Sequence, residues 1–426
     1  MIVNSKLATT TDVRTGRKKA LRNTRCSRKT ARGPRRRQLI EQPRARAAFK
    51  LCRRAVGRMT IPKSREVHPH LVGTLSPPDS LLCCRLNHLR ERFDRLAVAG
   101  VLLTRPQYGQ HFTGRSGGPL VIGESQMFRL DGVTANSTIG ALPDASPERL
   151  RLAIRECGIA GAAIGLEMRY ASAEHLEAIT DLCKVADIEH DLALSRLVKD
   201  EWEIAAIEAR VGVLEEALRA VARSAVDGLT EIEIASRAVS FLSLAAGSMI
   251  PFTGNLGSGA ACVDPNSRPS MRRVGADETF FVDLYPDLGG YHADLTRCFA
   301  VADASESART VHRVLEEALA AGIATVGGGA TARSIDTSVR RIFAQHGLLG
   351  FFPHHSGHSL GLFASEPPFL VPADETVVPA GAVLAIEPGL YIPGVGSFRL
   401  EVNVLVTDDG CRILGGLPTG LIQCGS

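Results

Sequence analysis

Apolar residues recur at steps of three and four along the segment that follows Asp200, and this spacing predicts a long amphipathic helix. Asp200 followed by Glu203 resembles a capping box, so the helix is expected to begin there. A second helix of the same kind is predicted over residues 307–326, after strand-like sequence near residue 280. Helices alternating with hairpins indicate an α+β domain of two similar halves at residues 196–420. The apolar positions of the first helix are Ile204, Ile207, Val211, Leu214, Leu218 and Val221.

A smaller α/β domain is predicted before it, at residues 84–192. The sequence RLNHLRERFDRLAVAG has helical periodicity and leads into the short apolar strand GVLLT. A second short strand, AAIGLE, precedes the helical sequence SAEHLEAITDL. Strands and helices that alternate in this way are typical of an α/β domain.

Two predicted hairpins carry paired carboxylates. In FFVDLYPDLGGYHADLTRCF, Asp283 and Asp294 lie symmetrically about the turn, which predicts that they sit opposite each other on one sheet face. In AIEPGLYIPGVGSFRLEVNVLVT, Glu387 and Glu401 are equidistant from Gly394. Any one of these acids could instead cap a turn or pair with an arginine. Opposed like charges in both hairpins, however, indicate that something cationic lies between them.

Three of the twelve histidines stand close together in FPHHSGHSLGLFASEPP. The even spacing of His354 and His358 predicts both side chains on one face of a strand, or one turn apart on a helix. His355 is then expected to point elsewhere. One histidine with four carboxylates forms the oxygen-rich set expected for two divalent ions.

The net charge of +5 averages two unlike regions, since residues 1–70 carry +18 and the remainder carries −13. The basic start has no apolar periodicity and cannot bury enough surface to fold. We therefore predict a disordered basic extension over residues 1–80, with no catalytic role. Two other interpretations are a gene start placed too early, with Met59 as the true initiator, and a targeting or nucleic-acid-binding arm. Apart from such an arm, nucleic acid is not an expected partner.

A chain of 426 residues has room for two to three domains. Its apolar runs are interrupted well before about 18 residues, so no membrane-spanning helix is expected. The ten cysteines form no CxxC pair, which indicates reduced thiols in a soluble, cytoplasmic protein.

Together these motifs resemble the pita-bread-fold metallopeptidases, which include methionine aminopeptidase, aminopeptidase P and prolidase, with creatinase as a relative that lacks the full metal set. The resemblance covers about residues 84–415. The lead RLNHLRERFDRLAVAGVLLT and the linker SRLVKDEWEIAAIEAR are typical of the aminopeptidase P, prolidase and creatinase branch. The resemblance implies a pita-bread catalytic domain, a creatinase-type N-terminal domain before it, and a homodimer.

By this resemblance the five metal ligands are Asp283, Asp294, His358, Glu387 and Glu401. They imply two divalent ions, manganese first and cobalt or zinc as alternatives, and an amide bond attacked by a hydroxide that bridges the ions. The resemblance also implies that Glu387 takes the proton of that water and that His354 contacts the substrate. Arg399 is implied to orient the neighbouring acids.

Two departures from the family pattern concern the substrate. Ser365 stands where family peptidases carry a histidine, and the region upstream of the first ligand lacks another one. Asp264 or Asn266 is the candidate substitute there, so both are placed with Ser365 in a possible substrate pocket. The missing histidines normally bind substrate and shuttle protons.

The sequence therefore predicts a metal-dependent hydrolase that acts as an Xaa-Pro dipeptidase or aminopeptidase on short peptides. One alternative is a branch relative that hydrolyses or eliminates from a small non-peptide compound, in the manner of creatinase or a lyase. The other is a non-catalytic binding protein that keeps the fold.

Overall fold

The computed structural model describes residues 77–131, 139–141, 145–224 and 226–425. The predicted basic extension lies outside these residues up to position 76. The described residues belong to one compact unit, so the division between residues 192 and 196 stays a prediction. Within this described part, no helix is long and apolar enough to cross a membrane.

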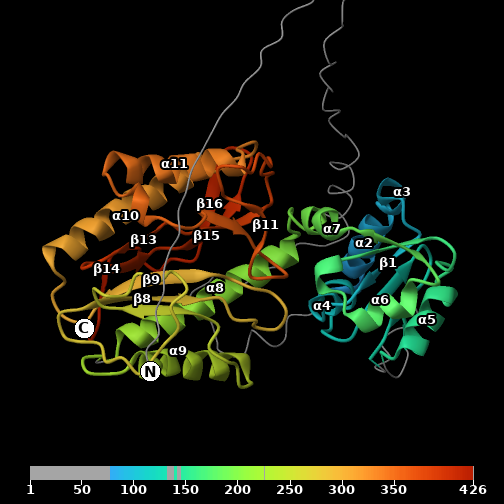
Figure 1. Ribbon diagram of the computed structural model, residues 1–426, viewed down its shortest axis with the longest axis horizontal. Helices are drawn as coiled ribbons and strands as arrows, with labels where there is room; N and C mark the ends of the chain where they lie inside the picture. Colours follow the sequence, from blue (N-terminus) through green and yellow to red (C-terminus); the bar gives the residue numbers. More distant parts are fainter. Residues whose placement is uncertain (1–76, 132–138, 142–144, 225, 426) are drawn as a thin grey trace, which may run out of the picture. The chain divides into compact units, whose positions relative to one another are not determined.

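The first described region is a mixed six-stranded sheet with helices packed around it (Figure 1). The strand order is β4-β3-β2-β1-β5-β6, and β1 pairs antiparallel with β2 but parallel with β5. The strands are β1 (Gly100–Leu103), β2 (Leu120–Gly123), β3 (Met127–Arg129), β4 (Ile139–Ala141), β5 (Ala163–Leu166) and β6 (Lys184–Asp187). The helices are α2 (Asp79–Arg90), α3 (Phe93–Leu96), α4 (Gln107–Thr113), α5 (Pro147–Glu156), η2 (Met168–Tyr170), α6 (Ala173–Ile179) and α7 (Glu189–Ser195).

The alternation of strands and helices in this region agrees with the sequence pattern. Every residue of β1 is buried, as its continuous apolar run predicts. The single helix expected before β1 is instead two, α2 and α3, and the second ends at Ala97 in the left-handed conformation (φ 53°). A left-handed residue cannot continue an α-helix, so the chain turns there into the strand.

The long helix α8 (Glu201–Ala222) begins where the sequence predicts. The Asp200 carboxylate accepts a hydrogen bond from the Glu203 backbone N–H, and the Glu203 side chain accepts one from the Asp200 N–H. This reciprocal pair satisfies two N–H groups that the first turn leaves without partners. The second predicted helix is α10 (Glu306–Thr325).

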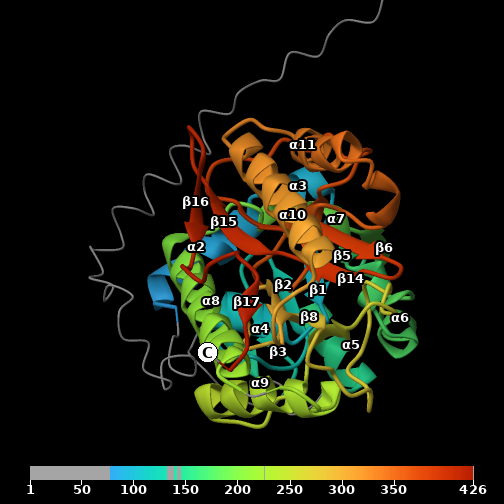
Figure 2. The same cartoon turned by 90° about the vertical axis from the view of Figure 1, so that its left-hand side faces the viewer.

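Strands form the middle of the second region, between two pairs of helices (Figures 1 and 2). Helices α8 and α9 pack on β9 and β7, whereas α10, paired with α11, packs on β12, β13 and β14. The sheets have the orders β17-β9-β8-β7, β11-β10-β12-β15-β16 and β13-β14. The remaining helices are α9 (Glu231–Ala246), α11 (Ala332–Gln345) and η3 (Leu349–Phe351). The strands are β7 (Gly254–Ser258), β8 (Thr279–Leu284), β9 (Leu295–Ala300), β10 (Gly357–Ser359), β11 (Glu366–Phe369), β12 (Val383–Ile386), β13 (Gly389–Ile392), β14 (Gly396–Arg399), β15 (Val402–Val406), β16 (Cys411–Leu414) and β17 (Ile422–Gln423).

Candidate metal centre

The first carboxylate pair lies on the β8–β9 hairpin, but not in the predicted register. Asp283 pairs with Thr296, and Asp294 directly precedes β9, so the prediction that the two acids face each other is wrong by two residues. The connection is a long loop over residues 285–294 that contains Pro286, which has no N–H to give to a ladder. Because Asp294 lies two residues from the partner of Asp283, the two acids still share one face as diagonal neighbours.

The second pair stands where the sequence places it. Gly389 lies opposite Arg399 in the β13–β14 ladder, and the β12–β15 ladder continues the same register. Glu387 and Glu401 fill the opposed positions between the two ladders. The prediction from their equal distance to the turn is therefore confirmed.

The backbone of each glutamate is hydrogen-bonded to a different neighbouring segment. The Glu387 N–H donates to the Ser356 carbonyl at 2.9 Å, which ties it to the histidine loop. The Glu401 N–H donates to the Thr296 carbonyl at 3.3 Å, which ties it to the aspartate hairpin. Three segments far apart in the sequence thus bring their functional side chains to one place.

His358 lies in the middle of β10 and is buried. Its Nδ1–H donates to the Ser359 carbonyl at 2.9 Å, which leaves Nε2 free to face the acids. Nε2 lies 3.3 Å from Glu387 Oε1 and 3.7 Å from Asp294 Oδ2. A histidine held through Nδ1 in this way presents the other nitrogen as a metal ligand.

His354 and His355 precede β10 in irregular backbone, so strand alternation does not apply to them. The expectation that His355 points elsewhere is wrong, because its Nδ1 lies 3.2 Å from Glu387 Oε1. The ring of His354 is held at both nitrogens. Nδ1 lies 2.8 Å from the His355 carbonyl and Nε2 lies 3.0 Å from the Tyr391 hydroxyl.

Four buried carboxylate oxygens converge here without a hydrogen-bond partner among the described residues. They are Asp283 Oδ1, Asp294 Oδ1, Glu387 Oε1 and Glu401 Oε1. The donor atoms of Asp294, His358 and Glu401 lie within 4.8 Å of one another. Buried unpaired carboxylate oxygens are costly unless a cation binds them. Carboxylates with an imidazole suit Mn²⁺, Co²⁺ and Zn²⁺, so these residues fit a pair of divalent ions.

The pKa values of the site also reflect crowded negative charge. Burial raises the pKa of Asp294 and of Glu401 well above the ordinary range, and the charges of neighbouring acids raise both further. Burial also acts to raise the pKa of Glu387, but His355 and His358 outweigh it and hold that pKa well below its usual value. Burial acts to lower the pKa of His358, but the adjacent Glu387 carboxylate outweighs it and raises that pKa to about 9. Divalent ions would replace the protons on these groups, so metal binding is expected to release protons.

Arg399 joins the aspartate hairpin to the ring of His354. Its Nη1 donates to Asp283 Oδ2 at 2.7 Å, and its Nε donates to the Tyr391 hydroxyl at 2.9 Å. That hydroxyl is the same one that holds His354 Nε2. The guanidinium therefore neutralises one acid and orients a histidine through a single tyrosine.

The residues predicted to line a substrate pocket lie on exposed loops. Arg399 Nη2 donates to the Pro265 carbonyl at 2.7 Å, which holds the loop with Asp264 and Asn266 beside the site. Both residues are exposed, and the Asp264 carboxylate accepts a hydrogen bond from the Asn266 N–H at 2.8 Å. Ser365 is exposed directly before β11. Their roles toward a substrate stay predictions.

Two supporting residues were not found from the sequence. The Thr296 hydroxyl donates to Glu401 Oε2 at 2.9 Å. The Asn403 side chain binds the backbone of Asp294 through both its oxygen and its nitrogen. Thr296 lies two residues after Asp294, and Asn403 two after Glu401, so the strand period of two was the available signal.

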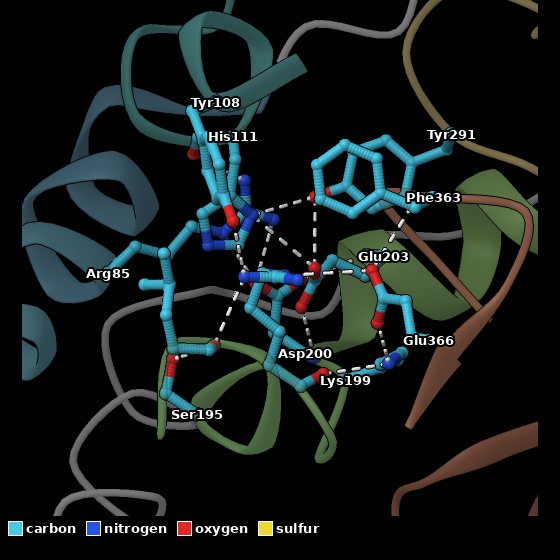
Figure 3. Close-up of polar contacts among 12 residues, drawn as sticks. Arg85, Tyr108, His111, Ser195, Lys199, Asp200, Glu203, Tyr291, Phe363 and Glu366 are labelled. Atoms are coloured by element: carbon cyan, nitrogen blue, oxygen red, sulfur yellow. Dashed lines mark hydrogen bonds and ion pairs between the residues drawn. The ribbon is translucent and has the colours of Figure 1, made fainter. Parts of the chain in front are cut away.

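A buried ion cluster fixes the loop that follows β10. Glu366 lies 3.3 Å from Lys199 Nζ and 3.6 Å from Arg196 Nε, and it accepts a hydrogen bond from the Phe363 N–H (Figure 3). Burial acts to raise the pKa of Glu366, but the charges of Lys199 and Arg196 outweigh it and lower that pKa. The residue after Ser365 is therefore anchored, although Ser365 itself is exposed.

A second buried cluster surrounds Glu203 at the start of α8 (Figure 3). The Tyr291 hydroxyl donates to Glu203 Oε1 at 2.9 Å and lies 3.0 Å from His111 Nδ1. Arg85 Nε donates to Asp200 Oδ2 at 2.8 Å. Burial, followed by the charge of Asp200, raises the pKa of Glu203 to about 7.

Replacing Glu203 with glutamine is expected to flatten the pH dependence of stability. A folded-state pKa above the unfolded value of 4.5 gives stability that is complete below 4.5 and is lost as the pH rises through about 7. Glutamine keeps the capping box but cannot ionise. Denaturant titrations between pH 4.5 and 8 measure the free energy of unfolding of both proteins. That of the variant should rise relative to that of the wild type, by on the order of 3 kcal/mol, as the pH rises.

Glu233 offers a matched control, because it occupies the same capping-box position at the start of α9 but is exposed. Hydrogen bonds from Thr230 lower its pKa. The free energy of unfolding of Glu233→Gln should therefore not increase relative to that of the wild type as the pH rises. A parallel shift of the wild-type and Glu203→Gln curves would contradict the assigned role of Glu203.

The fold and this site define a candidate centre for divalent cations within an α+β region. Residues 205–408 match metallopeptidase family M24. An Xaa-Pro dipeptidase of Pyrococcus horikoshii is 29% identical over 260 residues, which are 60% of this chain and 73% of that protein. The uncharacterized peptidase YqhT of Bacillus subtilis is 25% identical over 356 residues, or 79% of this chain and 99% of that protein.

Solved structures agree on the fold. An Xaa-Pro dipeptidase from Bacillus anthracis superimposes with a TM-score of 0.73 at 23% identity, covering 80% of this chain and 99% of that one. The match over residues 205–408 and the peptidase relatives support the metallopeptidase family predicted from the five-residue motif set. The chain is a metal-dependent hydrolase of the peptidase class.

Proposed function

We propose that the protein cleaves the amide bond before proline in dipeptides or short peptides, as an Xaa-Pro dipeptidase or a related aminopeptidase. The proposal rests on the four buried carboxylate oxygens of the site that have no hydrogen-bond partner in the described part of the chain, beside a histidine whose Nε2 lies 3.3 Å from Glu387. The Xaa-Pro dipeptidases of P. horikoshii and B. anthracis supply the substrate class. Two ions would be held by Asp283, Asp294, His358, Glu387 and Glu401. When bound, they would polarise the substrate carbonyl and acidify a water molecule.

Glu387 is suited to accept the proton of the attacking water. Its low pKa keeps it ionised at neutral pH, and Oε1 is the atom without a hydrogen bond within the described residues. A carboxylate that is already ionised, and fixed by its neighbours, can accept a proton without first losing one.

His354 is suited to a neutral, hydrogen-bonding role toward the substrate. Burial and the charge of Arg399 lower its pKa to about 4, so the ring is neutral at pH 7. Its Nδ1–H then donates to the His355 carbonyl, and its Nε2 accepts from the Tyr391 hydroxyl. A substrate N–H can take the place of that hydroxyl at Nε2 without a change of protonation.

Ser365, Asp264 and Asn266 are the proposed pocket residues. Serine can donate a hydrogen bond but cannot hold a proton near neutral pH. We expect proton transfer in this pocket to be slower than with a histidine, by up to about 10² to 10⁴ in rate. The same feature supports the second candidate, in which the substrate is a small non-peptide amide or amidine.

Several finer properties are part of the proposal. Manganese is the proposed ion, with cobalt or zinc as substitutes, and a homodimer is the proposed assembly. We propose that the first region is a creatinase-like N-terminal domain. The eight free cysteines of the described residues support a reducing, cytoplasmic location.

The test is turnover by the purified protein loaded with Mn²⁺, Co²⁺ or Zn²⁺. Xaa-Pro dipeptides, longer peptides with proline second, general aminopeptidase substrates and small non-peptide amides are compared. Hydrolysis of Xaa-Pro dipeptides that disappears in Asp283→Asn is expected. Turnover of non-peptide amides alone would favour the second candidate, and no peptide turnover with any ion would refute the first.

A further inference from the structure

His355 is a second histidine at the centre that neither the five-ligand set nor the proposed mechanism uses. The side chain is 33% exposed, but its Nδ1 atom is buried and has no hydrogen-bond partner within the described ranges. That atom lies 3.2 Å from Glu387 Oε1, which is also buried without such a partner. A buried imidazole nitrogen left unpaired beside an unpaired carboxylate oxygen indicates that a third group belongs between or beside them.

The neighbouring His354 cannot serve this purpose as it stands. Both of its ring nitrogens are engaged, one with the His355 carbonyl and the other with the Tyr391 hydroxyl. His354, His355 and Glu387 nevertheless form a group whose donor atoms lie within 4.8 Å of one another. Of the two histidines, only His355 offers a free donor atom in this group.

Glu387 joins this group to the five-ligand set. Its Oε1 lies 3.2 Å from His355 Nδ1 on one side and 3.3 Å from His358 Nε2 on the other. Ligands to one first-row ion, each about 2.0 to 2.2 Å from it, lie at similar separations from one another. Each of the two histidine nitrogens is therefore at a distance from Glu387 Oε1 that suits two ligands of one ion.

We propose that His355 is a further protein ligand of the metal pair, bound through Nδ1 beside Glu387. This inference rests on the metal centre of the proposed function. A neutral imidazole adds a ligand without adding charge to a site that already holds four acids. Because nitrogen ligands suit Co²⁺ and Zn²⁺ better than Mn²⁺, His355 would also raise the affinity for those ions relative to Mn²⁺.

The test counts the imidazole nitrogens bound to the ion in the full-length protein. Wild type, His355→Ala and His355→Gln are loaded with Mn²⁺ and compared by pulsed EPR, which detects ¹⁴N coupling from ligating histidines. Two coupled imidazoles are expected in the wild type and one in each variant. Titration calorimetry should show Mn²⁺ affinity reduced about 10- to 100-fold, with a larger loss for Co²⁺.

His346→Ala is the matched control, since His346 is exposed and paired with Glu317. It should keep two coupled imidazoles and the wild-type affinity. One imidazole in the wild type, or two in either His355 variant, would overturn the ligand role of His355 and leave the proposed function intact. Failure of the wild type to bind Mn²⁺, Co²⁺ or Zn²⁺ would overturn both. The wild-type count decides the question even if a variant does not fold.

Discussion

Asp294→Asn is expected to abolish hydrolysis while making the metal-free protein more stable. The carboxylate is buried among three other acids, and its pKa lies well above the unfolded value of 3.8. A raised folded-state pKa means that the protonated acid contributes fully to the free energy of unfolding at low pH. This contribution is lost as the pH rises, so the ionised acid destabilises the metal-free fold at pH 7. Asparagine cannot ionise, so it removes this penalty at pH 7.

The same substitution removes a ligand oxygen and one negative charge from the centre. Loss of several kcal/mol of transition-state stabilisation would reduce kcat/KM by at least about a thousandfold. Asp303→Asn is the matched control, because its carboxylate is almost fully exposed. Metal content, peptide turnover and urea unfolding with and without chelator are the measurements. An Asp294→Asn protein that is less stable than the wild type without metal would contradict the assignment.

Arg399→Met is expected to destabilise the metal-free protein by about 3 to 5 kcal/mol, because it leaves a buried acid without its counter-charge. The arginine donates to Asp283, to the Tyr391 hydroxyl and to the Pro265 carbonyl, and all three would lose a partner. Added Mn²⁺ should restore part of the loss, since the ion supplies positive charge beside Asp283. The measurement is denaturant unfolding with and without Mn²⁺.

Tyr391→Phe distinguishes the contribution of the Arg399–Asp283 ion pair from that of the hydrogen bonds made by the Tyr391 hydroxyl. It removes one hydroxyl that accepts from Arg399 and holds His354, so a loss of about 1 kcal/mol is expected. If Arg399→Met costs no more than Tyr391→Phe, the ion pair with Asp283 does not support the centre as described.

Symmetry about a turn predicted the correct strand register for Glu387 and Glu401 but the wrong one for Asp283 and Asp294. The lengths of the two turns explain the difference. The chain around Gly394 reverses tightly, so equal distance from the turn is the true register for Glu387 and Glu401. Residues 285–294 form a wide loop, and the partner of Asp283 is Thr296, two residues after the position that symmetry predicts. Sequence symmetry therefore gives the register only where the reversal is short.

Side-chain direction outside regular structure could not be predicted. His355 was expected to point away because strand alternation was extended into residues that are not a strand. The buried cluster around Glu203 was also beyond reach, since His111 and Tyr291 are 180 positions apart. Periodicity predicts contacts within an element or a hairpin, whereas such pairs depend on how whole elements pack.

The backbones of Glu387 and Glu401 are hydrogen-bonded to two other segments. This arrangement affects how the protein binds and releases its ions. The main chain of each acid is held by hydrogen bonds to neighbouring segments of the fold, so the position of its backbone does not require a bound cation. The backbone entropy of these two ligands is lost when the chain folds, and ion binding does not have to compensate for that part. The centre should then load and unload reversibly in a folded protein, and its ionic content should follow the concentrations of free cations around it.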